Sequence, residues 1–157
     1  MKTDVLQFLK QLSEAQYRMI DVLQRKQVLL VRPDSDAFSA ISIEEQRTVE
    51  TMQSLIERRE ELLASARLQN INGSSIEALC GFLFPRNDDV SKRLIEAKGR
   101  TNQIRFLAFT NWTLSRKSLV HISQILEFIE TNGQGKATYK PQDTGMNKSG
   151  GLIDKAA

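Results

Sequence analysis

Apolar side chains recur at three- and four-residue steps from the start of the chain, the spacing that gathers them on one side of an α-helix. The pattern predicts a first helix with Thr3 as its N-cap and its end at Arg32, because the residue before Pro33 is pushed out of helical geometry. Gln16 and Lys26 occupy the two gaps in its apolar stripe. The stripe consists of Val5, Leu9, Leu12, Met19, Leu23 and Leu30.

The same periodicity predicts a second helix after a turn at residues 33–36. Its stripe is narrow, and Glu45, Thr48 and Arg59 fall within the seam, so this helix is expected to be stabilised by a partner along one side. It is expected to end in the loop that closes with Gly73, since glycine takes the left-handed conformation without a side-chain clash. Its apolar members are Phe38, Ile41, Met52, Leu55, Ile56, Leu62, Leu63 and Ala66.

Two more helices are predicted in the second half of the chain. The sequence Ser-Ser-Ile-Glu at 74–77 fits a capping box, in which the serine hydroxyl and the glutamate carboxylate each bind a free backbone amide. It predicts a short helix over 75–82. The polar residues 87–89 can cap a long helix over 89–130, interrupted only by Gly99.

These elements predict an all-α fold. At ~1.5 Å per residue the three long helices span roughly 40, 50 and 60 Å, and their short connections make neighbouring helices antiparallel. The expected architecture is an up-and-down bundle, or an elongated antiparallel coiled coil, of three long helices plus one short helix. Residues 1–130 form the predicted helical domain. Residues 131–157 are rich in glycine and contain several lysines, and we expect a flexible C-terminal tail there.

The last helix carries an unusually wide apolar surface. On a helical wheel its apolar side chains between 104 and 129 cover about 160°, whereas a helix packed on one side needs ~100°. One interpretation is that this helix is central and contacts all the others. The alternative is that a flank with Phe109, Trp112, Leu119 and Leu126 stays exposed as a groove for another protein's amphipathic helix. The polar side of the wheel holds Arg105, Arg116, Lys117, Gln124 and Glu127.

Charge and reactive residues exclude several functions. The formal net charge of +3 arises from 22 basic and 19 acidic residues that are interspersed, which does not favour nucleic-acid binding. The basic cluster of Lys92, Arg93, Lys98 and Arg100 is expected to be a solvated face. A single Cys80 and a single His121 are too few ligands for zinc, and no nucleophile motif surrounds either. We therefore expect no catalytic residue, no metal, no cofactor and no enzymatic activity.

The cellular compartment can be predicted from the cysteine count and from the apolar segments of the sequence. One cysteine cannot form an internal disulfide, and no stretch approaches 18 uncharged apolar residues. The first ten residues have charges within their apolar run and no cleavage-site pattern. A cytoplasmic protein without an integral membrane segment is expected.

Several short motifs follow one another in the second half of the chain. They are Asn111-Trp112, Ser118-Leu119, Ser123-Gln124-Ile125-Leu126, Thr138-Tyr139 and Gly150-Gly151-Leu152-Ile153-Asp154-Lys155-Ala156. A charged second-helix stretch from 36 to 63 precedes them. In these motifs, and in the order of its elements over nearly its whole length, the chain resembles the FlgN family of bacterial flagellar export chaperones, whose charged repeat is similar to the stretch from 36 to 63.

The resemblance implies a cytoplasmic chaperone that holds unassembled hook-filament junction (hook-associated) proteins and delivers them to the flagellar type III export apparatus. It implies client contacts at Trp112, Leu119, Ile122 and Leu126, near the C-terminus. It also implies that Tyr139 docks to an export-gate component. The alternative function is a coiled-coil scaffold or homo-oligomer, in which a second copy covers the apolar surface. Nucleic-acid binding is a third, weaker alternative.

Overall fold

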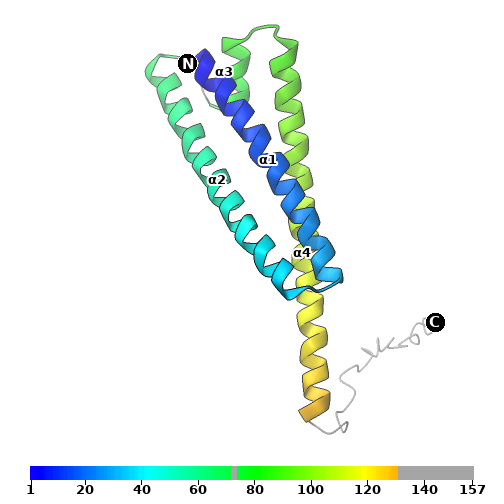
Figure 1. Ribbon diagram of the computed structural model, residues 1–157. Coiled ribbons are helices and arrows are strands. Elements are labelled where there is room, and N and C mark those ends of the chain that lie inside the picture. The colour runs from blue at the N-terminus through cyan, green and yellow to red at the C-terminus, as the bar shows by residue number, and fades with distance from the viewer. Residues whose placement is uncertain (72–73, 131–157) are drawn as a thin grey trace, which may run out of the picture. The chain divides into compact units, whose positions relative to one another are not determined.

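The computed structural model describes residues 1–71 and 74–130, which form four helices (Figure 1). They are α1 (Lys2–Val31), α2 (Ser35–Leu68), α3 (Ile76–Leu83) and α4 (Asp88–Glu130). The predicted all-α fold of three long helices and one short helix is confirmed. α4 passes through Gly99 without interruption. The predicted tail at 131–157 and the predicted left-handed Gly73 lie outside the described residues.

The ends of α1 follow local chemistry, with one correction. α1 ends at Val31, immediately before Arg32-Pro33, as predicted. The predicted N-cap at Thr3 is wrong, because the helix begins at Lys2 and the carbonyl of Met1 already accepts from the amide of Val5 at 3.0 Å. The N-terminal ammonium instead pairs with the carboxylate of Asp4 at 2.8 Å, and this hydrogen bond lowers the pKa of Asp4.

The next two helices begin at side-chain caps. Asp34 accepts a hydrogen bond from the amide of Ala37 at 2.9 Å, and Ser75 accepts one from the amide of Ala78 at 3.1 Å. The predicted capping box is therefore only half correct, since with Ser75 as the cap Glu77 stands one position too early to close it. α2 ends before Asn70, whose φ of 57° supplies the left-handed turn.

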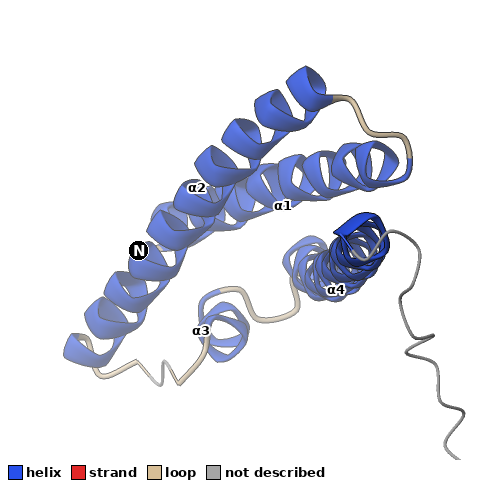
Figure 2. Cartoon of the chain, turned by 90° about the horizontal axis from the view of Figure 1, so that it is seen from below, coloured by secondary structure: helices blue, strands red, loops and turns tan. Residues whose placement is uncertain are grey.

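Contacts within the chain define two units, Met1–Ser118 and the part from Leu119 onward. In the first unit α1 lies between α2 and α4, and α3 covers one end (Figures 1 and 2). α1 and α2 pack together as antiparallel neighbours. Their seam forms most of the main core, together with α3 and the start of α4. That core contains Val5, Phe8, Leu9, Ala15, Leu55, Leu62, Leu63, Ala66, Ile76, Leu79, Cys80, Leu83 and Val90.

A buried polar cluster joins α1 to α4. Gln16 is 1% exposed, and its amide nitrogen donates to the carbonyl of Ala97 and to the hydroxyl of Thr101, both at 2.9 Å. Its amide oxygen accepts from Nε of Arg100 at 2.9 Å. The gap that Gln16 leaves in the apolar stripe of α1 is thus the place where α4 is anchored. Since buried polar groups need matched partners, these bonds fix the register between the two helices.

Two residues of α4 depart from expectation within this interface. Arg100 is buried, so its predicted place on a solvated face is wrong. Its guanidinium stacks 4.8 Å from the ring centroid of Tyr17 and reaches Glu96 at 3.6 Å, and these contacts compensate for its lost water. Asn111 is buried as well, and donates to the carbonyl of Leu23 at 2.8 Å, whereas its Oδ1 has no partner.

Candidate protein-binding surface on α4

One side of α4 in the first unit belongs to the core. Leu107 is 7% exposed and packs with Met19, Ile20 and Leu23 in a second, smaller apolar cluster. Ile104 packs against the same cluster and is partly buried. For this part of the apolar arc, the interpretation as core is correct.

The other flank of α4 is exposed in the same unit. Phe109 and Trp112 are 66% and 55% exposed, and their ring centroids lie 5.9 Å apart. The guanidinium of Arg116 lies 5.5 Å from the ring centroid of Trp112. Arg116 was predicted on the polar side of the helix, yet its spacing of four residues brings it over the indole. The flank is therefore aromatic and basic together.

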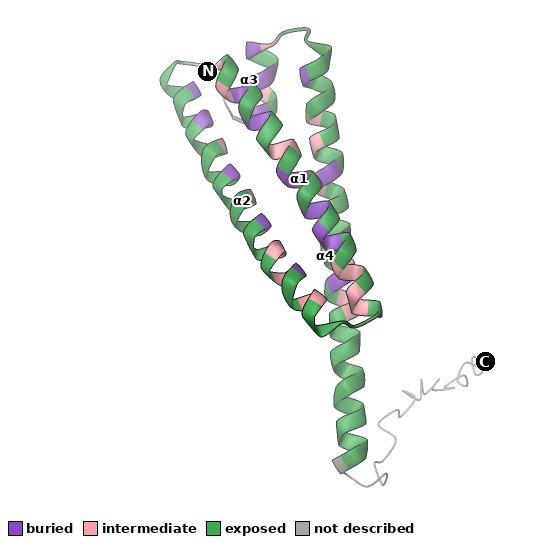
Figure 3. Ribbon diagram, viewed as in Figure 1, coloured by how far each residue is buried: buried purple, intermediate pink, exposed green. Residues whose placement is uncertain are grey.

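From Ser115 to Ile129 every residue of α4 is exposed, as Figure 3 shows in green. The predicted client contacts Leu119, Ile122 and Leu126 all lie in this stretch and are each more than half exposed. Water-exposed side chains of this size would gain about 1.5–3 kcal/mol each from complete burial. The exposed apolar residues of the second unit, which we call the terminal apolar segment, are Leu119, Val120, Ile122, Ile125, Leu126, Phe128 and Ile129.

Two features of this surface were missed from the sequence, and Tyr139 cannot be placed. Phe106 is 68% exposed but was not included in the apolar surface derived from the helical wheel. Its position three residues before Phe109 could have indicated that the two side chains are neighbours on the helix. The stacking of Arg116 on Trp112 could have been read from the i, i+4 spacing. Tyr139, the predicted export-gate residue, lies outside the described residues.

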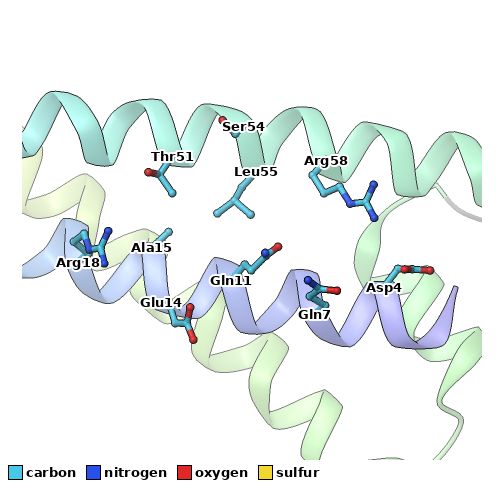
Figure 4. A pocket seen from close by; sticks show the side chains of 10 residues that line it. All are labelled: Asp4, Gln7, Gln11, Glu14, Ala15, Arg18, Thr51, Ser54, Leu55 and Arg58. Atoms are coloured by element: carbon cyan, nitrogen blue, oxygen red, sulfur yellow. The ribbon is translucent and has the colours of Figure 1, made fainter.

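The hollow between α1 and α2 does not gather its polar side chains at one point (Figure 4). It has a volume of about 510 Å³ and a mixed polar lining that includes Asp4, Glu14, Arg18 and Arg58. Figure 4 shows these side chains strung along the two helices, with no gathering about one point. Small-molecule sites usually bring a few polar groups together in a concave apolar pocket. This hollow lacks that convergence.

Cys80 and His121 belong to different units of the chain. Cys80 is buried in the core, and burial raises the pKa of its thiol, so the reactive thiolate is disfavoured. His121 lies on the exposed part of α4. Within residues 1–71 and 74–130, no three metal-ligating side chains gather in a group. The helices described here also include none long and apolar enough to cross a membrane.

A row of large apolar side chains exposed on one helix is typical of a surface that binds another polypeptide. The sequence profile described as FlgN protein matches residues 1–144. The chain therefore belongs to the FlgN family, a family of flagellar export chaperones. No individual curated protein and no solved structure matches the chain at a significant level.

Proposed function

We propose that the protein binds unassembled hook-filament junction (hook-associated) proteins in the cytoplasm and delivers them to the flagellar type III export apparatus. One observation carries the proposal: α4 exposes a long run of large apolar side chains, from Phe109 through the terminal apolar segment. Clients that polymerise through amphipathic terminal helices would present a matching apolar stripe. Covering that stripe before export prevents premature assembly.

The client contacts proposed are Phe109, Trp112, Leu119, Ile122 and Leu126. In sequence they recur at steps of three, four and seven residues, the spacing by which one helix lays its apolar side along another. An interface of about 1,200–2,000 Å² with a few apolar anchors gives specific yet reversible binding. Reversibility is needed because the client must leave before it enters the export channel. Tyr139 is proposed as the residue that docks to an export-gate component.

The test is a calorimetric titration of the full chain with a purified hook-associated protein of the same bacterium. Leu119→Asp or Leu126→Asp places a charge within the apolar surface, and each is expected to weaken binding about 10- to 100-fold. The matched control is Gln124→Asp, which adds the same charge at an exposed polar position and should leave affinity unchanged. If the natural protein and its three variants bind the client with equal affinity, this surface is not the client-binding site.

The second candidate, a homo-oligomer, is favoured by the same exposed apolar residues, because another copy of α4 could cover them. Light scattering at low micromolar concentration separates the two candidates. A monomer that forms a complex only when client is added supports the chaperone. A dimer that persists on dilution, and that Leu126→Asp dissociates, supports the oligomer.

A further inference from the structure

Four residues of α4 in the first unit form a basic–aromatic row: Arg105, Phe109, Trp112 and Arg116. They are spaced by four, three and four positions, so at 3.6 residues per turn all four fall within roughly 60° of the helix circumference. Both aromatic rings are exposed and lie beside each other, and one arginine stands at each end of the pair. The row lies on the side of the helix away from buried Leu107.

The two arginines have no acidic partner among the described residues. The guanidinium of Arg116 lies against the ring of Trp112, and neither arginine forms an ion pair with a carboxylate in that part of the chain. In the bundle, by contrast, Arg25 pairs with Asp21 and Glu44. The sequence explains the difference, since no Asp or Glu occurs between Glu96 and Glu127. This acid-free stretch contains the basic residues Lys98, Arg100, Arg105, Arg116 and Lys117.

We propose that the basic–aromatic row selects client helices that carry acidic residues on both sides of their apolar anchors. The inference rests on the proposed function and names the chemistry of the partner at that same surface. Arg105 and Arg116 are 11 residues apart, which is roughly 16 Å along a helix. A client helix lying alongside would present two carboxylates at about the same spacing, three turns apart, with the aromatic pair packing on the apolar residues between them.

A helix fits this row better than a membrane or a single-stranded nucleic acid. The row is one residue wide and follows the helical period, so it matches a ridge of side chains on another helix. A membrane surface attracts clusters of four to eight basic residues, whereas here only two stand on the row. A protein groove that binds single-stranded nucleic acid has basic side chains all along the path of the phosphate backbone. The chain's net charge of +3 is too small to provide a positive electrostatic field of that extent.

The test uses two synthetic amphipathic helical peptides with the same leucine stripe. One has two glutamates about 11 residues apart and the other has glutamines at those positions. Emission of the single tryptophan, Trp112, reports binding to the full chain at low salt. The glutamate peptide is expected to bind about 2- to 30-fold more tightly than the glutamine peptide, as two exposed ion pairs allow. Added salt should remove this preference.

The variant Arg105→Gln/Arg116→Gln should bind both peptides alike. Its control is Arg47→Gln/Arg67→Gln, which lowers the net charge equally at exposed positions of α2 and should keep the preference. Equal affinity of the natural protein for both peptides contradicts the inference, as does a preference that survives in the Arg105/Arg116 variant. Tighter binding to phosphatidylglycerol vesicles or to oligo-dT than to the glutamate peptide also overturns it, in favour of lipid or nucleic acid.

Titration with a hook-associated protein distinguishes this failure from failure of the proposed function. If that client binds the natural protein and the Arg105/Arg116 variant equally well at low salt, the charge inference fails while the chaperone proposal stands. If the client does not bind the natural protein at all, the chaperone proposal fails whatever the peptides show.

Discussion

The two stretches of α4, residues 88–114 and 115–129, are built from similar apolar residues but meet different environments. In the first stretch Val90 and Leu107 are buried, whereas in the second every residue is exposed. In the first stretch Leu107 packs against Met19, Ile20 and Leu23 of α1. An apolar stripe on a helix therefore indicates core only as far as a partner helix accompanies it.

The largest expected difference is between aspartate substitutions in the two stretches. Leu107→Asp places a carboxylate in the cluster of Met19, Ile20 and Leu23, and should lower the free energy of unfolding by more than about 3 kcal/mol. Leu126→Asp, at a residue 53% exposed, should change it by less than about 0.5 kcal/mol. Urea denaturation followed by circular dichroism measures both. Similar losses in the two variants would contradict the distinction drawn here.

A smaller effect is expected at the polar anchor between α1 and α4. Gln16→Leu leaves Nε of Arg100 without its acceptor and removes the hydrogen bond that the Thr101 hydroxyl accepts, and should lower the free energy of unfolding by about 1–3 kcal/mol. Gln11→Leu, at an exposed position of α1, is the control and should have little effect. If the double variant Gln16→Leu/Arg100→Met is as unstable as the single variant, the loss does not come from the unpaired arginine.

The smallest effect concerns Asn111, whose Oδ1 is buried without a hydrogen-bond partner. Asn111→Leu removes that unpaired oxygen and keeps a side chain of similar size. We expect the free energy of unfolding to stay the same or to rise by up to about 1 kcal/mol, because the lost bond to Leu23 is offset by relief of the desolvated oxygen. Thermal denaturation beside the exposed control Asn102→Leu measures the change. A clear loss of stability would show that the single bond to Leu23 matters more than the unpaired oxygen.

Much of the bundle could be predicted because the helical spacing of the apolar residues and the residues at the helix ends indicate the same elements. Thr48 was placed in the seam of α2 and is buried, and Gln16 was placed within the stripe of α1 and is buried. The ends at Pro33 and Ser75 were correct to within a residue. The error at Thr3 has a local cause. Met1 serves as the N-cap through its backbone carbonyl, which accepts from the amide of Val5, so the helix starts before Thr3 without a side-chain cap.

The polar contacts between α1 and α4 could not be predicted in the same way. A long arginine such as Arg100 is solvated in most positions, and only the three-dimensional register brings Gln16 and Tyr17 within its reach. The exposure of Trp112 was equally undetermined, because the helical wheel shows which residues share a side but not whether another helix covers it. The exposure of Trp112 follows from its place on the side of α4 away from buried Leu107.

The central claim is that the exposed side of α4 becomes covered when a client binds. Iodide quenching of Trp112, the only tryptophan, tests it most directly with a client whose own tryptophans are replaced by phenylalanine. The account predicts efficient quenching of the free protein, since the indole is 55% exposed, and loss of most of that quenching when client is saturating. Weak quenching in the free protein, or quenching that saturating client leaves unchanged, would contradict the account.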